Sequence, residues 1–523
     1  MLQTFAKHLK VNNIYVKITI TISLLERRSK MKKIVAVFLM VALAISALAT
    51  LVACLPEQPI HPQYFTGTVT LESGTIQGLV DQNVAVFKGI PYAKAPVGDL
   101  RWRAPQPVES WEGTLDCTLW GANALQGDAT VFDVWTEEFI QDTDPTHYRD
   151  GIVYSEDCLN LNVWTSTNVG DGKPVLVYIH GGGYNSGGAS CEVYDGTNVA
   201  LKDVVFVSIH YRVGALGFLA TQELAEEDPN GSAGNYGILD QIQALKWVQE
   251  NIHKFGGDKN NVTIMGQSAG AGSVNALICS PLAKGLFVNA VSASHNSINR
   301  DWQTLEQRIA QAPTTYKGKT VDQLRAIPAS QLKGQSLPTV GPVVDGYVLS
   351  DTYRNCVASG NCNDVNLMTG MVTHDDLISS VYTSSTVTAV DSMIALQNAV
   401  CQARINGGLQ KDAYVYMFTR NVPGNTKGTT GAYHSYELAY FLGNFTSHRA
   451  SVWTEQDFEL GEAMLNYLVA FCKTGSPSYE EEPVFWANNI GDLCYIQFDV
   501  EIENKTLSQD IYQKVMNNYK LGL

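Results

Sequence analysis

The sequence predicts an α/β fold with a large, mostly parallel central sheet flanked by helices. Residues 174–179 and 204–209 are continuous apolar runs, which is typical of strands buried on both faces. Residues 240–252 carry apolar residues at helical spacing and are followed by a glycine stop. A short strand, residues 262–265, then runs into Gly266-Gln267-Ser268-Ala269-Gly270 and a helix. This strand–turn–helix arrangement around G-x-S-x-G places a serine on a tight, exposed turn.

The N-terminal residues 1–53 are predicted to be a targeting region outside the fold. Lys32-Lys33 precede an uncharged run over 34–53, and the run ends at Cys54, as in bacterial lipoprotein signals that lipidate this cysteine. Met31 is then the favoured start, and residues 1–30 are an over-extended start. An uncleaved membrane anchor is the alternative, because about twenty apolar residues span a bilayer. Basic residues before the run predict export of the remainder to the cell surface or periplasm, with secretion as the alternative.

Residues 54–66 carry three prolines and predict an extended tether. Residues 67–523 predict a single domain, since they contain no internal repeat and no second apolar core. The whole chain has a net charge of −15 at pH 7, and removal of residues 1–53 leaves 28 basic and 50 acidic residues, a charge of −22. Such a surface argues against nucleic acid as a partner. Membrane contact is expected through the N-terminal lipid or anchor alone, and the oligomeric state is left open.

Short alternating segments open the domain. Residues 69–71, 75–79 and 84–88 are separated by turn residues and predict a small N-terminal antiparallel sheet. Later strands are predicted over 366–372, 413–418 and 495–498, and an amphipathic helix over 508–519. Without Cys54 nine cysteines remain, an odd number, and the favoured disulfide pairs are Cys117 with Cys158 and Cys356 with Cys362.

A reactive serine needs a base to take its proton and a carboxylate to orient that base. On a sheet of this type the three follow in the order serine, acid, histidine. Of the histidines after Ser268, His434 is favoured over His448 because it lies in a loop that enters a helix. Asp375 and Asp376 follow the strand over 366–372, and at this point they are equally good candidates for the acid.

A glycine run after the strand 174–179 predicts an oxyanion hole. In His180-Gly181-Gly182-Gly183, no side chains shield the backbone N–H groups, and the N–H of Ala269 at the helix start adds a further donor. The alternative is a flexible glycine turn. No metal or cofactor is required by this chemistry.

Seven ordered segments together resemble the type-B carboxylesterase/lipase family of the α/β-hydrolase fold, which includes para-nitrobenzyl esterases and cholinesterases. The segments are Phe87-Lys-Gly-Ile-Pro-Tyr-Ala93, Ser155-Glu-Asp-Cys-Leu-Asn-Leu-Asn-Val-Trp164, Tyr178-Ile-His-Gly-Gly-Gly183, Tyr211-Arg-Val-Gly-Ala-Leu-Gly-Phe-Leu219, Gly234-Asn-Tyr-Gly-Ile-Leu-Asp-Gln241, Phe255-Gly-Gly-Asp258 and the G-x-S-x-G turn. The resemblance implies a serine carboxylic-ester hydrolase that acts on a small-molecule ester.

The resemblance also implies roles for single residues. Ser268 would be the nucleophile, His434 the base, and Gly182, Gly183 and Ala269 the oxyanion donors. Counting from the V-D-G segment at Asp345-Gly346, the acid position falls on Asp375, where most relatives have Glu. Cys117 with Cys158 would be the family's first disulfide. The alternatives are a lipase or sterol-ester hydrolase with the same triad, and a non-catalytic binding protein on this fold.

Two departures from the family bear on the substrate. Gln267 stands where many relatives carry Glu, which argues against a cationic choline-type ester and for neutral esters of short to medium acyl length. Asp375 and His434 are 59 positions apart. This is fewer than the family usually has, and it predicts a more open cleft.

Overall fold

The structure is a computed structural model that describes residues 67–521, except 82, 128–141, 169–171, 336, 376–378, 422, 424–430, 446–451 and 490. The predicted targeting region and tether, residues 1–66 with Cys54, lie outside the described residues. The described residues belong to one compact unit by their contacts. Within the described ranges, no helix is both long and apolar enough to cross a membrane.

Eleven strands of the described chain form one large sheet, and the prediction of an α/β fold with a mostly parallel sheet is confirmed. In spatial order the strands are β18 (Glu503–Thr506), β17 (Cys494–Phe498), β16 (Ala413–Phe418), β15 (Asn366–Val372), β12 (Asn289–Ala293), β11 (Gly257–Gln267), β9 (Lys173–Ile179), β10 (Val205–Ile209), β8 (Asn160–Ser166), β4 (Val84–Pro91) and β3 (Leu79–Asp81). The strands from β10 to β17 are parallel, and both edges are antiparallel.

The central strands are apolar throughout because both of their faces are buried. In β9, Val175, Val177 and Ile179 belong to one hydrophobic core, while Leu176 and Tyr178 belong to a second core on the opposite face. Successive side chains of a strand point to opposite faces, so a strand covered on both sides has no polar alternation.

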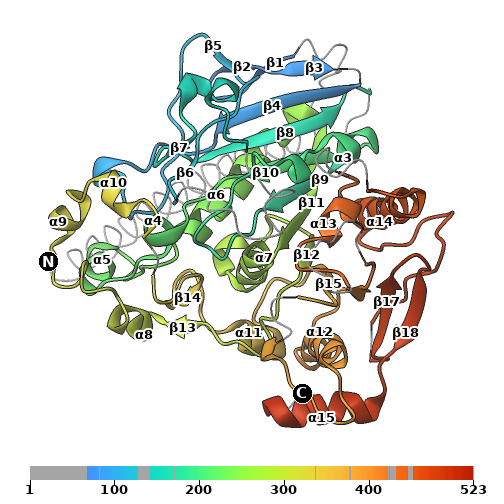
Figure 1. Cartoon of the computed structure of the whole chain (residues 1–523). Helices are drawn as coiled ribbons and strands as arrows, with labels where there is room; N and C mark the ends of the chain where they lie inside the picture. The colour runs from blue at the N-terminus through green and yellow to red at the C-terminus, as the bar shows by residue number, and fades with distance from the viewer. Residues whose placement is uncertain are drawn as a thin grey trace, which may run out of the picture. The chain divides into compact units, whose positions relative to one another are not determined.

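Helices cover the two faces of the sheet. In Figure 1, α6 and α7 lie on one side of the sheet, and α3 and α14 lie on the other. The helices are α3 (Thr197–Leu201), α4 (Gly214–Phe218), α5 (Gln222–Glu227), α6 (Tyr236–Asn251), α7 (Ala269–Cys279), α8 (Leu305–Ala310), α9 (Val321–Arg325), α10 (Ala329–Leu332), α11 (Tyr353–Ser359), α12 (Ala389–Asn406), α13 (Glu437–Phe441), α14 (Glu455–Thr474) and α15 (Gln509–Tyr519).

The small N-terminal sheet differs in one respect from the prediction. Its members are β1 (Thr68–Thr70), β2 (Thr75–Gln77) and β5 (Thr114–Asp116), and β5 is parallel to β2. The third predicted segment, 84–88, belongs to β4 of the large sheet, where it pairs with β8. Alternation indicates a strand but does not say which partner supplies its hydrogen bonds.

The predicted disulfides are absent from the described chain, and this corrects the sequence-based pairing. Cys117 and Cys158 are buried free thiols in different surroundings. The guanidinium of Arg149 contacts the sulfur of Cys117, whereas Cys158 lies near the buried Arg212–Asp240 ion pair. The thiol of Cys356 contacts Cys279 and is not bonded to Cys362.

Candidate active site

Ser268 occupies a strained turn between β11 and α7. Its backbone has φ 58° and ψ −125°, a conformation that L residues rarely adopt. The flanking glycines make the turn possible: a Cβ on Gly266 would lie 2.3 Å from Gly270, and a Cβ on Gly270 would lie 2.1 Å from the carbonyl oxygen of Ile179. Strand and helix therefore approach each other more closely than any side chain would allow, and the serine is held at the carboxyl end of the parallel sheet.

Asp375 and His434 meet although 59 positions separate them. The backbone N–H of His374 donates to the carbonyl of Ala432 at 2.7 Å, and His374 forms a bridge with Tyr433. This pairing places the next residue of each segment side by side, with Oδ2 of Asp375 2.7 Å from Nδ1 of His434. Asp375 is fully buried. Asp376, the rival candidate, lies outside the described residues.

The contacts of His434 define its tautomer. An ionised carboxylate only accepts hydrogen bonds, so Nδ1 of His434 carries the proton and donates it to Asp375. Nε2 of the neutral ring is then an acceptor. The side-chain amide of Gln267, the residue before Ser268, donates to this Nε2 at 3.2 Å. A basic ring nitrogen is thus held beside the serine turn.

The glycine loop after β9 lies against the same turn. A Cβ on Gly181 would be 3.1 Å from Cβ of Ser268. Gly182 and Gly183 have φ values of 108° and 59°, which favour glycine. In the part of the chain that the structure describes, the N–H groups of Gly182, Gly183 and Ala269 donate no hydrogen bond. Backbone donors beside a serine hydroxyl are suited to receive a negatively charged oxygen.

The sequence-based interpretation missed a buried carboxyl group next to this site. Glu437, the first residue of α13, is fully buried, and the hydroxyl of Ser294 donates to its Oε1 at 2.5 Å. Burial raises the pKa of Glu437 to about 7, against the opposing effects of Ser294 and His434. The sequence does contain an indication of this buried carboxyl group: the acidic residue three positions after His434 directly precedes the apolar run 438–442.

Another histidine that follows Ser268, His295, lies near enough to the Asp375–His434 pair to interact electrostatically with both residues. The ring of His295 is half-buried, its Nδ1 is 2.8 Å from the hydroxyl of Ser297, and desolvation together with the charge of Arg300 lowers its pKa to about 4. His448 falls outside the described residues. Within those residues, no cluster of three or more His, Cys, Asp or Glu side chains is arranged to hold a metal ion.

Comparisons with protein families, known sequences and solved structures agree on one family. The model of the carboxylesterase family matches residues 66–406 and 389–517. Para-nitrobenzyl esterase of Bacillus subtilis (strain 168) is 30% identical over 497 residues, which cover 84% of this chain and 97% of that protein. Fumonisin B1 esterase of Sphingopyxis macrogoltabida is 38% identical over 315 residues, which cover 57% of this chain and 54% of that protein.

A solved structure of PNB esterase superposes with a TM-score of 0.71 at 26% identity, covering 86% of this chain and 98% of that one. PNB esterases have the α/β-hydrolase fold, and the large mixed sheet flanked by helices described above is of the same class. The family match extends across both the sheet and the serine turn, and this chain therefore belongs to the carboxylesterase family of ester-hydrolysing enzymes.

Proposed function

We propose that Ser268, His434 and Asp375 form the catalytic triad and hydrolyse neutral carboxylic esters through an acyl-enzyme. The observation that carries this proposal is the 2.7 Å contact between Asp375 and His434, next to a serine on a strained turn. Nε2 of His434 takes the hydroxyl proton while the serine oxygen attacks the ester carbonyl. The N–H groups of Gly182, Gly183 and Ala269 hold the oxyanion, and the alcohol leaves with the proton from His434. Water then repeats these steps on the acyl-enzyme.

The proposed substrates are esters of short to medium acyl length without a positive charge. The amide of Gln267 supports this, since a neutral side chain 3.2 Å from His434 supplies no negative charge to attract a cationic alcohol group. Relatives named for para-nitrobenzyl esters and for fumonisin B1 are consistent with an ester hydrolase of this kind. Activity that rises steeply with acyl length at an oil interface would instead indicate a lipase.

Replacement of the nucleophile tests the proposal. We expect Ser268→Ala to lose ~10⁶-fold in turnover of a short p-nitrophenyl ester, because the triad acts as a unit. Ser280→Ala removes the same hydroxyl at the other end of α7 and should keep full activity. A fluorophosphonate probe should modify Ser268 in the parent protein. Retained activity of Ser268→Ala, or no adduct on Ser268, would contradict the proposal, and the second result would favour a non-catalytic binding protein.

A further inference from the structure

Three cysteines of the described chain lie at the junction of α7 and α11. Cys279 is the last residue of α7, Cys356 lies within α11, and both side chains are buried. Their two thiols are in hydrogen-bond contact, with Cys279 as the donor. Cys362, which follows α11, is half-buried and close enough to interact electrostatically with both. The proposed ester hydrolysis uses none of these thiols.

The chain after α11 is hydrogen-bonded to the carboxyl end of α7. The backbone N–H of Asn363 donates to the carbonyl of Ile278 at 2.8 Å. Its side-chain amide donates to the carbonyls of Leu277 and Ser280, each at 3.1 Å. These carbonyls lie on both sides of Cys279 in the sequence. The two helices are therefore held together within a few residues of the thiol contact.

The sulfur of Cys356 accepts three hydrogen bonds. The donors are the thiol of Cys279, the hydroxyl of Ser350 and the backbone N–H of Asp351. Hydrogen bonds to a sulfur stabilise its thiolate, and together they lower the pKa of Cys356 although burial acts in the opposite direction. Burial raises the pKa of Cys279, which keeps its proton and donates it to Cys356. Because the thiolate is the form that attacks a disulfide, Cys356 is the more nucleophilic member of the pair.

We propose that Cys279 and Cys356 are a site of disulfide formation, at which a small disulfide of the oxidised-glutathione type is reduced. The Cys356 thiolate attacks one sulfur of the reagent and releases a first glutathione thiolate, which takes the proton of Cys279. The Cys279 thiolate then attacks the sulfur of Cys356 and releases the second glutathione. The protein loses two protons and two electrons and gains one S–S bond, and the reagent becomes two thiols. Since both cysteines are buried, we expect this exchange during folding, before α11 packs on α7.

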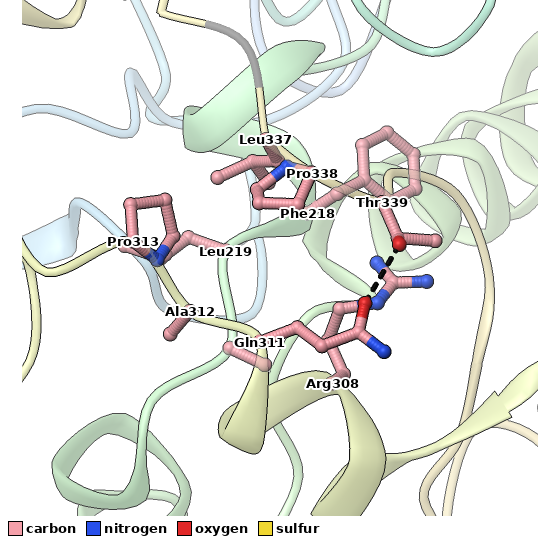
Figure 2. Close-up of a pocket in the computed structure, with 10 residues that line it drawn as sticks. Phe218, Leu219, Arg308, Gln311, Ala312, Pro313, Leu337, Pro338 and Thr339 are labelled. Atoms are coloured by element: carbon pink, nitrogen blue, oxygen red, sulfur yellow. Dashed lines mark hydrogen bonds between the residues drawn. The ribbon is translucent and has the colours of Figure 1, made fainter.

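The disulfide would close a loop around residues 280–355, a segment that contains α8 to α10. Figure 2 shows part of the packing of this segment on α4, where Arg308, Gln311 and Thr339 of the segment and Phe218 of α4 line a small pocket. Thr339 donates to Gln311 at 2.9 Å, as the dashed line shows. The link would therefore restrain a folded part of the domain and not an isolated surface loop.

The enclosed segment also lies against the glycine loop of the candidate active site. Arg308 donates to the carbonyl of Gly341 at 3.2 Å. A Cβ on Gly341 would lie 2.8 Å from the ring of Tyr184, so the two residues are in close contact. Tyr184 directly follows Gly183. The disulfide would thus stabilise the segment that packs on this loop, and its formation does not depend on ester hydrolysis.

The pairing is tested by mapping disulfides in the full-length protein after refolding from urea in a glutathione redox buffer. Iodoacetamide blocks the remaining thiols, and mass spectrometry of the peptides identifies the link. We expect Cys279 linked to Cys356, and Cys362 alkylated. A link between Cys356 and Cys362, which spacing alone favoured, would overturn the proposal. Alkylation of both Cys279 and Cys356 would overturn it as well.

Loop closure also predicts a stability effect that depends on the redox state. By its chain entropy, a closed loop of this length lowers the equilibrium constant of unfolding ~10³-fold, which corresponds to a rise in Tm of up to ~5 °C for a domain of this size. We expect dithiothreitol to lower the Tm of the refolded parent by this amount. Cys356→Ala should lose this shift, whereas Cys362→Ala, the matched control, should keep it.

Each protein is compared with itself in the presence and absence of dithiothreitol, so a cavity left by the substitution cancels. The peptide map uses the parent protein and is informative even if a variant folds poorly. A shift that persists in Cys356→Ala would contradict the pairing, and so would a shift that is lost in Cys362→Ala.

Discussion

At the scale of single residues, Gln267 is hydrogen-bonded to Nε2 of His434, the atom that we propose as the proton acceptor. In the structure its amide NH₂ donates to Nε2 of His434 at 3.2 Å. After proton transfer that nitrogen becomes a donor, and the carbonyl oxygen of the same amide is able to accept from it. The carboxylate of a glutamate only accepts hydrogen bonds, so at this position it could pair only with the protonated ring of His434. The neutral amide of Gln267 therefore accommodates both protonation states of His434 without favouring the imidazolium.

Gln267→Glu is expected to raise the pKa of His434, because a carboxylate at this distance stabilises the imidazolium by ~1–3 pKa units. Since the neutral ring is the active form, the acid limb of kcat/KM should move to higher pH, with a loss of ~10-fold or more at pH 6 and little change at pH 9. The measurement is the pH profile for a neutral p-nitrophenyl ester. Gln331→Glu adds the same charge at an exposed position and should leave the profile in place. If the acid limb of the kcat/KM profile of Gln267→Glu does not shift, residue 267 does not influence the pKa of His434.

At the scale of elements, close packing of α7 on β9 fixes the serine turn. Gly270 lies in the first turn of α7, where Ala would gain ~1 kcal/mol from helix propensity. A Cβ there would, however, lie 2.1 Å from the carbonyl oxygen of Ile179, which is backbone and cannot swing away. The steric effect exceeds the propensity gain, because overpacking of a tight core typically costs ~1–3 kcal/mol.

Gly270→Ala is therefore expected to lower the free energy of unfolding by ~2 kcal/mol and to reduce kcat at least ten-fold by displacing Ser268. Urea unfolding and turnover of a short ester measure the two effects. Gly127→Ala is the matched control, since its added Cβ would have its nearest neighbour at 3.4 Å, an ordinary contact. A variant as stable as the parent would show that α7 shifts at no cost.

The elements that are best predicted from the sequence are the buried ones, because burial requires an apolar run in a strand or apolar residues at helical spacing. Continuous apolar runs identified β9 and β10, and the spacing of apolar residues identified α6. The strand β18 was missed because Glu503–Thr506 is polar, and its strand conformation depends on backbone pairing with β17. β18 lies at the edge of the sheet. That position depends on the strand's neighbour, so the polar segment has no apolar pattern from which it could be predicted.

At the scale of the whole molecule, the candidate site depends on contacts between distant segments. Chain order and local context favoured Ser268 and His434, but residue patterns alone left Asp375 and Asp376 equal. The contact of Asp375 with His434 follows from the bridge of His374 with Tyr433, a long-range pairing that no local pattern contains. The distances between sulfur atoms also depend on long-range packing, and this is why the favoured disulfide pairs are absent from the described residues.

Folding also encloses Glu437, and this makes the stability of the whole molecule depend on pH. Burial raises the pKa of Glu437 from 4.5 to about 7, with Ser294, His434 and Asp375 as the neighbours that act on it. Between these two values the folded state holds a proton that the unfolded state has released. The free energy of unfolding therefore falls as pH rises through this window, and above about pH 7 the full cost of ionising the buried group is present.

Glu437→Gln should remove this dependence, because the amide keeps an acceptor for the hydroxyl of Ser294 and does not ionise. A shift of this size corresponds to ~3 kcal/mol. We expect the free energy of unfolding of the variant, relative to the parent, to rise by up to ~3 kcal/mol between pH 4.5 and pH 8. Urea unfolding of both proteins at several pH values measures the difference, and other titrating groups cancel in the comparison. If the free energies of unfolding of the two proteins change in parallel with pH, Glu437 reaches solvent when it ionises.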